Sequence, residues 1–408
     1  MKTRFLFLAA ILLVSMTSCP VNASPGLIER AYTFPSTGFV EYPADDPTLK
    51  TEGSRIVDSS GNDFVPFGVN VMSPMFPPDY DIDRPPEQPT PALLDKLKTL
   101  KANLVRITLV KEAWDDEVGY KECIDQWVNG LAERRIRSYL DLHDIWYVGS
   151  GYGPPPEESW HSWMYEAMTS DQAKRNALFT LYEGWAERYG EQKYMVGINI
   201  ANEPFGWATE LGVSIDDLRS AWRSFIVDAV QHIHSINPDL LVFVNGDGLN
   251  YGAWLEAFVG DVPVQGNVVY TVHHYPEDHL HNWAGSGFPE GSPTNNYAQT
   301  YENGDFTLGY SQLQEWLQWS AFDLLSDNVP VLIEEFGFSE GRDQYSMFAN
   351  WERVCDDFYE ICYGQGIGVL QWQLARANDK FGVLEGSDWL ILTEVGQKWA
   401  ENLNLYAE

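Results

Sequence analysis

The sequence alternates short, continuously apolar segments with longer segments of helical periodicity, and it does so around eight apolar runs. Such runs are typical of parallel strands buried on both faces, because crossover helices cover the two sides of the sheet. Eight strand–helix units close into a barrel, so the pattern predicts an α/β fold of the (β/α)8 type. The expected strands are Val65–Val71, Leu104–Val110, Ser138–His143, Met195–Ala201, Leu240–Asn245, Val268–His274, Val329–Glu335 and Gly366–Trp372.

Helical periodicity follows most of these strands. The expected helices are Pro91–Lys101, Tyr120–Glu133, Asp171–Tyr189, Ile215–Ile236, Leu308–Leu325, Tyr345–Tyr363 and, closing the ring, Glu394–Leu403. The segment after the fifth strand, Trp254–Phe258, is short. Ahead of the first strand, the Ser-Gly-Asn sequence at 60–62 separates two apolar runs within Arg55–Val71, which predicts a small hairpin leading into the barrel.

The first residues have the pattern of a targeting segment. Lys2 and Arg4 form a basic start, and the apolar run Phe5–Val14 is too short to span a bilayer. The small-residue pattern ending at Ala23 predicts cleavage there, so residues 1–23 would be a signal peptide and the protein would be secreted. The alternative is lipidation of Cys19, which would anchor the protein at the cell surface.

The remaining sequence predicts one domain. Residues 24–50 are rich in Pro, Ser and Asp, and we expect a linker or a wrap over the outside of the barrel. Residues 51–408 would then form the barrel itself. No further run of 18 apolar residues occurs, so no membrane span is expected. The sequence leaves the oligomeric state open.

Two of the expected strands end in carboxylates. The stretch Met195–Phe205 runs from a buried strand into Asn202, Glu203 and a proline that stops the strand. A carboxylate directly after an apolar strand is costly unless it lies at an open end with partners, and barrels carry their chemistry at that end. The stretch Val329–Gly337 has the same form, which suggests a pair, although a solvated Glu in a turn is the simpler reading of either one alone.

Other strand ends add polar side chains to the same rim. They are Arg106 in the second strand, His143 in the third, His273 and Tyr275 in the sixth and Trp372 in the eighth. Arg106 is flanked by apolar residues and needs a carboxylate partner, because an unpaired buried charge is costly. Two of these residues also have simpler readings, since His143 could bond backbone and Trp372 could fill the core.

The seventh strand carries two adjacent acids, Glu334 and Glu335. Neighbouring residues of a strand face opposite sides, so only one of the two is expected to enter the mouth of the barrel. The residues themselves leave open which one does.

Composition limits the partners. The chain has 59 acidic and 26 basic residues, a net charge of −33, which argues against nucleic acid and anionic membrane surfaces and is compatible with a neutral polysaccharide. The 16 Trp and 21 Tyr suit stacking on sugar rings, although a large core also uses such side chains. Tryptophans expected in rim loops are Trp114, Trp146, Trp160, Trp163, Trp207 and Trp283.

Neither a metal nor another cofactor is expected. The histidines at 273, 274, 279 and 281 cluster, but a His-x-His pattern is by itself a poor signal for a metal site without a carboxylate or Cys at ligand spacing. No Cys-x-x-Cys occurs, and Cys355 and Cys362 would lie about 10 Å apart along one helix, too far for a disulfide.

In these motifs the chain resembles glycoside hydrolase family 5. The resemblance runs from about Arg55 to the end of the chain. It rests on seven motifs in order: the hairpin with Gly68-Val69-Asn70, Arg106, Leu-Asp-Leu-His ending at His143, Asn202-Glu203-Pro204, His273-x-Tyr275, Glu335-Phe336-Gly337 and Trp372. It implies a barrel hydrolase whose acid/base and nucleophile follow the fourth and seventh strands.

The family pattern places the nucleophile before Phe-Gly, so the resemblance implies Glu335 as nucleophile and Glu203 as acid/base. Glu334 would face the helix layer or lie behind the site. Arg106 and the Tyr275 hydroxyl would keep Glu335 ionised. The remaining implied roles are sugar 2-hydroxyl binding by Asn202, sugar binding by His143, a place beside Glu203 for His273, and a subsite floor at Trp372.

The expected function is therefore that of a secreted retaining β-glycanase acting on β-1,4-glucan, most simply as an endoglucanase. A β-mannanase or an exo-β-glucanase would use the same fold, and the long connections 144–170 and 275–306 would suit an exo-enzyme if they closed one end of the cleft. A non-catalytic carbohydrate-binding barrel is a different class, which the presence of both Glu203 and Glu335 disfavours.

Overall fold

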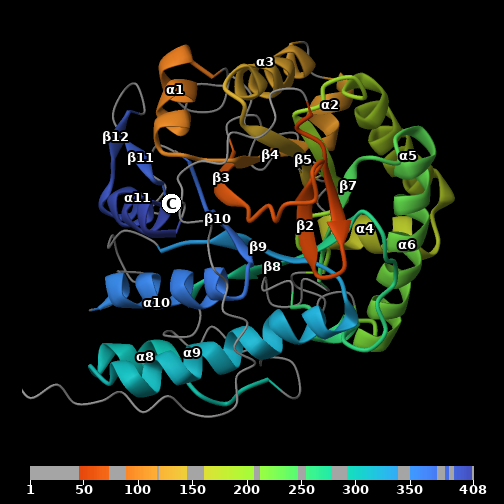
Figure 1. Ribbon diagram of the computed structural model, residues 1–408. Helices are drawn as coiled ribbons and strands as arrows, with labels where there is room; N and C mark the ends of the chain where they lie inside the picture. The colour runs from red at the N-terminus through yellow and green to blue at the C-terminus, as the bar shows by residue number, and fades with distance from the viewer. Residues whose placement is uncertain are drawn as a thin grey trace, which may run out of the picture. The chain divides into compact units, whose positions relative to one another are not determined.

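The predicted barrel is confirmed. The computed structural model describes residues 46–72, 89–116, 119–144, 160–205, 212–246, 254–276, 292–338, 350–374, 382–385 and 390–406. Eight parallel strands close in the order β10-β3-β4-β5-β6-β7-β8-β9, and Figure 1 shows helices outside them. The strands are β3 Phe67–Val71, β4 Leu104–Val110, β5 Arg137–Asp144, β6 Met195–Asn199, β7 Leu241–Asn245, β8 Val268–His274, β9 Val331–Phe336 and β10 Gly368–Gln371. Every expected strand is present, with its ends moved by no more than two residues.

Several helices begin where the sequence supplies a cap. Thr90, Asp171 and Ser214 each accept a hydrogen bond from a backbone N–H in the first turn of the helix that follows. The helices are α1 Pro91–Thr99, α2 Lys111–Asp116, α3 Tyr120–Glu133, α4 Trp160–Thr169, α5 Gln172–Arg188, α6 Ile215–Ile236, α8 Tyr297–Glu302, α9 Phe306–Ser320, α10 Trp351–Gly364 and α11 Glu394–Tyr406. The short helices α2, α4 and α8 were not among the expected ones.

Two expected helices have different ends. The helix expected over Leu308–Leu325 stops at Ser320, because the backbone at Ala321 leaves the helical region, and a 3-10 segment, η6 (Phe322–Asp327), follows. α10 begins only at Trp351, after Asn350 in the left-handed conformation. The short segment after the fifth strand contains one 3-10 turn, η4 (Glu256–Phe258).

The N-terminal hairpin is present but is formed by different residues. β1 (Leu49–Glu52) pairs antiparallel with β2 (Arg55–Asp58), and the turn between them uses Gly53 at φ 63°. The turn expected at 60–62 also forms, with a single bridge between Val57 and Asp63. Since β1 begins at Leu49, the expected boundary at residue 50 falls within this strand.

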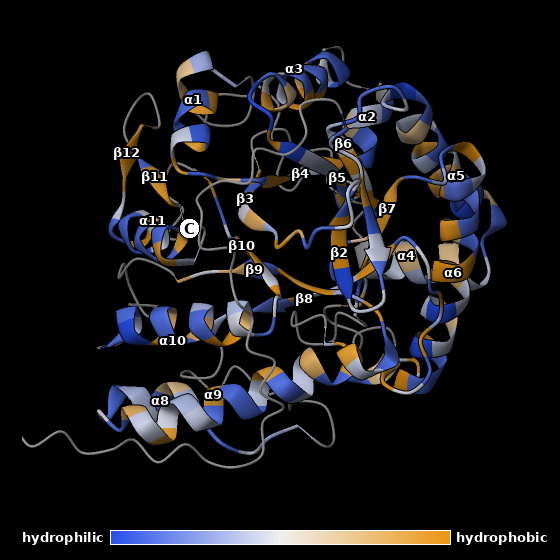
Figure 2. Ribbon diagram, in the orientation of Figure 1, coloured by the Kyte–Doolittle hydropathy of each residue, from blue (hydrophilic) through white to orange (hydrophobic). Residues whose placement is uncertain are grey.

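Apolar residues of this hairpin region pack into the barrel interior at the amino ends of the strands. Leu49, Ile56 and Phe64 pack in one cluster with interior residues near the amino ends of the strands, among them Leu104 and Leu241. The larger core lies between strands and helices, and the fully buried Trp127, Trp185, Trp222, Trp316 and Trp399 belong to it. Figure 2 shows the mixed hydrophobic and hydrophilic residues of the outer helices, as expected for helices with one face on a barrel. The barrel interior is thus apolar near the amino ends of the strands, and its polar side chains lie toward the carboxyl ends.

Glycine is required where neighbouring strands approach closely. A Cβ on Gly68 in β3 would lie 1.7 Å from the carbonyl oxygen of Leu104 in β4. A Cβ on Gly197 in β6 would lie 2.4 Å from the carbonyl oxygen of Leu241. Contacts this short are not compatible with any side chain, so both positions fix the spacing of the barrel wall.

Several predictions fall on residues that the structure does not describe. These are the signal peptide with Cys19, most of the segment 24–50, and the side chains of Trp146, Trp160, Trp207 and Trp283. None of the described helices has the length and apolar character that a membrane crossing requires.

Candidate active site

The structure brings together all eight side chains that the sequence placed at the strand ends. They come from β4, β5, β8 and β9 and from the residues that follow β6, β8 and β10. Every one of them contacts at least one other: Arg106, His143, Asn202, Glu203, His273, Tyr275, Glu335 and Trp372. The carboxyl end of the barrel thus carries one connected polar cluster, as expected for this fold.

Glu203 lies in the turn directly after β6, in a constrained backbone conformation. Its φ is +38°, a region that side chains other than glycine seldom occupy, and such strain persists only where the surroundings hold it. Its N–H donates to Oδ1 of Asn245, at the end of β7, over 2.8 Å. Its carboxyl Oε1 lies 2.6 Å from Nδ1 of His273. The backbone and the carboxyl group of Glu203 are therefore both held by neighbouring strands.

Glu335 is held by two donors. Nη1 of Arg106 donates to one carboxylate oxygen, and the Tyr275 hydroxyl donates to the other over 2.6 Å. Nε2 of His273 lies 3.5 Å away. Burial alone would raise the pKa of Glu335, but the positive charges of His273 and Arg106 and the Tyr275 hydrogen bond outweigh it and lower that pKa. Glu335 is thus an ionised carboxylate at neutral pH.

The pKa of Glu203 moves in the opposite direction. Burial raises it, and the negative charge of Glu335 adds to this, while the contact with His273 opposes both without cancelling them. One oxygen of Glu203 and one of Glu335 lie within 4.8 Å of each other. Two close carboxyl groups with opposite pKa shifts are suited to complementary roles as acid and as anion.

His273 lies between the two acids. Burial would lower its pKa, but the carboxylates of Glu335, Glu203 and Glu334 outweigh burial and raise the pKa to about 10. The neighbouring His274 points elsewhere, stacked against Tyr297 and Phe358, and burial lowers its pKa to about 3. His274 is a neutral core residue, so the two described histidines of the cluster lie in different environments, while His279 and His281 lie outside the described residues.

Arg106 is the buried cation at the centre of the site. Its Nη2 lies 2.9 Å from Asp141 and donates to Asn202 over 2.7 Å, and its Nη1 also donates to Asn70 over 3.0 Å. Burial would lower its pKa, but Asp141, Glu334 and Glu335 raise it well above its usual range. The partner that the sequence required for this arginine is therefore a group of three carboxylates.

His143 and Trp372 form the partly exposed edge of the site. Nδ1 of His143 lies 2.8 Å from Asp141, which leaves Nε2 facing the amide of Asn202 at 3.5 Å. The two rings stack with centroids 5.3 Å apart and planes within 12°. His143 therefore bonds a side chain and not the backbone, and Trp372 keeps part of its ring accessible. The peptide between Trp372 and Gln373 is cis.

The strand β9 departs from simple alternation. Val272 pairs with Ile333 and His273 pairs with Glu335, so β9 contains one residue more than β8 at this point. The register with β10 shifts in the same place. A bulge of this kind places consecutive side chains on the same side of a sheet. The expectation that Glu334 and Glu335 would face opposite sides is therefore wrong. Of the two places that the resemblance implied for Glu334, the helix layer and a position behind the site, the structure has the second.

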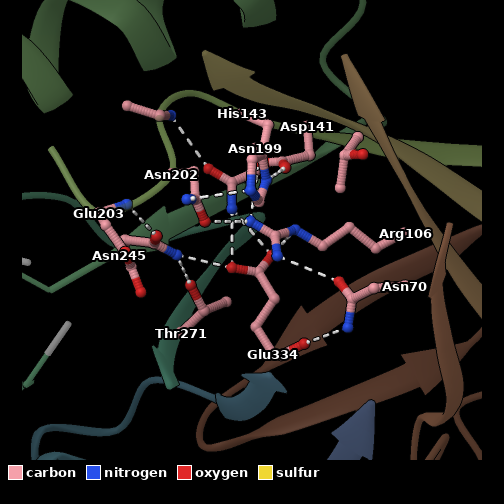
Figure 3. Close-up of polar contacts among 12 residues, drawn as sticks. Asn70, Arg106, Asp141, His143, Asn199, Asn202, Glu203, Asn245, Thr271 and Glu334 are labelled. Carbon is pink, nitrogen blue, oxygen red and sulfur yellow. Dashed lines mark hydrogen bonds and ion pairs between the residues drawn. The ribbon is translucent and has the colours of Figure 1, made fainter. Parts of the chain in front are cut away.

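Glu334 lies in the barrel interior, fully buried. It accepts hydrogen bonds from the Tyr139 hydroxyl over 2.7 Å, from Asn199 over 2.8 Å and from Asn245 over 2.6 Å. Figure 3 shows Asn199, Asn245 and Arg106 around Glu334. Burial would raise its pKa, but Arg106 and His273 hold it well below the usual range.

The sequence analysis missed the polar residues behind the rim. Asn70 and Asp141 stood within quoted motifs but were given no role, and Tyr139, Asn199 and Asn245 were counted as strand residues only. All five are buried. The available signal was the one that singled out Arg106, a polar residue within an otherwise apolar strand.

The rim tryptophans that can be described differ in environment. Trp114 is buried and packs edge to face against Trp185, with ring centroids 5.8 Å apart. Trp163 is partly buried beneath the ammonium group of Lys174. Trp114 is therefore a core residue.

Among the described residues, Glu203, His273 and Glu335 have the geometry that could hold a metal ion. Both oxygens of Glu335 already accept hydrogen bonds, from Arg106 and from Tyr275. A buried guanidinium group in direct contact opposes a second cation at the same carboxylate. This donor set is better suited to an acid/base pair than to a metal. The described cysteines, at 123, 355 and 362, are buried free thiols.

A (β/α)8 barrel with a buried carboxylate pair at its carboxyl rim defines the class of barrel glycosidases. Residues 57–378 match the family described as Cellulase (glycosyl hydrolase family 5). The chain belongs to this family and is a glycoside hydrolase. The resemblance drawn from the motifs is thereby confirmed.

Solved structures share the fold at low sequence identity. A β-glucanase from Saccharophagus degradans in complex with cellotetraose superposes with a TM-score of 0.64 at 15% identity, covering 92% of this chain and 98% of that one. An endocellulase from Pyrococcus horikoshii with cellotetraose gives 0.59 at 17%, covering 88% and 98%. The cellulose synthase subunit Z from Clostridioides difficile gives 0.54 at 17%, covering 83% and 99%. A search of curated proteins by sequence finds no match.

Proposed function

We propose that the protein hydrolyses β-1,4-linked glucan by double displacement, with retention of configuration. The observation that carries this proposal is the separation of Glu203 and Glu335, whose nearest oxygens lie within 4.8 Å. Retaining glycosidases hold their carboxyl groups about 5–5.5 Å apart, whereas inverting enzymes need about 6.5–9.5 Å to admit a water molecule. The opposite pKa shifts of the two acids support the same division of roles.

In the first step, Glu335 attacks the anomeric carbon while Glu203 donates its proton to the glycosidic oxygen. The glycosidic bond breaks, the leaving sugar departs as an alcohol, and an ester to Glu335 forms. In the second step, Glu203 takes a proton from water, and the oxygen of that water adds to the anomeric carbon. The ester bond then breaks and Glu335 leaves as a carboxylate.

The surrounding contacts support this sequence of steps. Arg106 and Tyr275 both donate to Glu335, which favours the ionised nucleophile. Oδ1 of Asn202 accepts from Arg106 and one N–H of its Nδ2 faces His143, which leaves the second N–H for a sugar 2-hydroxyl. The partly exposed pair of His143 and Trp372 provides a hydrogen-bonding edge and an aromatic face for the neighbouring sugar.

The comparisons support the proposed substrate. The matching family is described as Cellulase, and two of the similar structures were solved with cellotetraose. β-1,4-Glucan cleaved within the chain is therefore the proposed substrate and mode. Secretion through a signal peptide ending at Ala23 belongs to the same proposal, and a mature protein that begins at Ser24 by N-terminal sequencing would support it.

A polysaccharide panel tests substrate and mode together. An endo-acting glucanase should lower the viscosity of carboxymethyl cellulose steeply while few reducing ends appear. A proportional fall, with glucose or cellobiose as the sole early product, would instead indicate an exo-enzyme. Rapid hydrolysis of mannan without hydrolysis of glucan would show that mannan is the substrate, and the proposed mechanism would be unchanged.

Stereochemistry tests the mechanism. Because two displacements restore the configuration, early proton NMR spectra of a cellopentaose digest should show the β anomer before mutarotation. The α anomer as first product would overturn the double displacement.

A further inference from the structure

Glu334 is a second buried carboxylate that the reaction described above does not use. It is fully buried behind the site, so it does not reach a substrate. Its two oxygens accept hydrogen bonds from side chains of three neighbouring strands, those of Tyr139 in β5, Asn199 in β6 and Asn245 in β7. It also lies 3.4 Å from Nε of Arg106. A structural salt bridge with the arginine alone would not require this set of amide donors.

An ionised carboxylate only accepts hydrogen bonds, so it decides how each amide is oriented. The nitrogen of Asn245 must face Glu334, and its oxygen therefore points away, where it accepts the N–H of Glu203 over 2.8 Å. The nitrogen of Asn199 also faces Glu334, and its oxygen accepts the N–H of Ala201 over 3.0 Å. Through these two amides, Glu334 fixes the acceptors of the backbone N–H groups of Ala201 and Glu203 (Figure 3).

A third connection runs through His273. Its Nδ1 contacts the carboxyl group of Glu203 at 2.6 Å, and its Nε2 lies 3.6 Å from Glu334. The imidazole therefore bridges the two acids, with Glu335 at 3.5 Å from the same nitrogen. Glu334 therefore lies next to the groups that hold the backbone of Glu203 and also next to His273, which contacts the Glu203 carboxyl group.

We propose that Glu334 is a positioning residue for Glu203, acting through Asn199, Asn245 and His273. The proposal rests on the assignment of Glu203 as acid/base. The bulge in β9 makes this arrangement possible, since without it Glu334 and Glu335 would not share the interior. Glu203 needs such support because its own backbone has φ +38°.

A positioning role for Glu203 makes a prediction that depends on the leaving group. Cleavage of a cello-oligosaccharide needs a proton from Glu203, whereas glycosylation by an aryl glycoside with a good leaving group does not. In Glu334→Gln, kcat on cellopentaose should fall about 10- to 100-fold with KM little changed. The rate of the first burst with dinitrophenyl cellobioside should change less than about threefold, because it depends on Glu335.

A second variant tests the same connection from its other end. Asn245→Ala removes the acceptor for the Glu203 N–H and keeps Glu334. It should show the same loss on cellopentaose and the same near-normal burst, and it also covers the case in which Glu334→Gln does not fold. Equal losses on both substrates in either folded variant, or no loss on cellopentaose, would overturn the proposal.

Asp357→Asn is the matched control. Asp357 is also a buried carboxylate that accepts from a tyrosine, Tyr301, and pairs with an arginine, Arg353, but it lies on α10 in the helix layer. This variant should keep both rates within about twofold, even where its melting temperature falls as far as that of Glu334→Gln.

Glu335→Gln separates this proposal from the proposed function. If Glu335→Gln is inactive on both substrates, the nucleophile assignment stands and the Glu334 data are decisive for positioning. If Glu335→Gln stays active, the proposed function itself fails, and the Glu334 proposal fails with it.

Discussion

Glu203 and Glu335 are the same residue type, a few ångströms apart, and their surroundings give them opposite properties. Glu335 accepts hydrogen bonds from a guanidinium and a phenol hydroxyl, whereas Glu203 contacts one imidazole and is otherwise only partly buried. The pKa of Glu203 is accordingly raised and that of Glu335 lowered. At the scale of single residues, the neighbours and not the side chain decide which carboxyl group is the acid.

The opposite shifts predict the pH dependence of kcat/KM. The active form needs Glu335 ionised and Glu203 protonated, so activity falls at low pH as Glu335 gains a proton and at high pH as Glu203 loses one. In Tyr275→Phe, the lost hydrogen bond should raise the pKa of Glu335 and move the acid limb to higher pH. The alkaline limb serves as the internal reference. An acid limb that stays in place would mean that Glu335 does not control it.

Replacing each acid separately tests the two roles. Glu335→Gln should reduce kcat about 10⁴-fold or more on every substrate, because no other group can form the ester. Glu203→Ala should reduce hydrolysis of β-glucan about 10²- to 10⁴-fold but spare the burst with an activated aryl glycoside. Equal losses on the two substrates for Glu203→Ala would remove it as the acid. Activity in Glu335→Gln would remove Glu335 as the nucleophile and with it the proposed double displacement.

At the scale of elements, strand spacing is set by small residues at a few positions. Gly68 in β3 meets the Leu104 carbonyl of β4, so Gly68→Ala should separate the first two strands of the barrel. We expect a loss of about 3 kcal/mol or more in unfolding free energy, measured by urea denaturation. The displacement would also reach Asn70, which bonds Arg106, so activity should fall as well.

Gly184→Ala is the control for this substitution. Gly184 lies within α5, and a Cβ there would meet nothing within 4 Å. The same chemical change should therefore stabilise the protein by about 0.5–1 kcal/mol, since alanine is the better helix former. A similar destabilisation by both changes would show that the strand contact is not the cause.

At the scale of the whole molecule, the charge is strongly unbalanced, at −33. Self-repulsion among the acidic residues opposes folding, and salt screens it over a Debye length of about 10 Å at 0.1 M. The melting temperature should therefore rise by roughly 2–5 °C between about 0.05 and 0.5 M NaCl. KCl at equal ionic strength should act equally if screening is the cause. A melting temperature that falls with salt would mean that attractive ion pairs dominate.

The sequence by itself determined the barrel and its rim. Strand periodicity and the prolines and acids that end the strands are local properties, and they identified eight strands and the polar residues at their ends. The choice of Glu335 over Glu334 came from the family resemblance. Arg106 was readable for the same reason, as a charge within an apolar strand that had to find a carboxylate.

The tertiary structure alone decided what lies behind that rim. The bulge in β9 depends on its register with both β8 and β10, so strict alternation gave the wrong direction for Glu334. The paired hairpin lies around Gly53, because Leu49–Glu52 pairs with β2 and Leu49 and Ile56 pack in the barrel interior, whereas the turn at 60–62 carries a single bridge. The separation of Glu203 and Glu335, and hence their opposite pKa values, likewise exists only once the strands close, because each is set by groups from other strands.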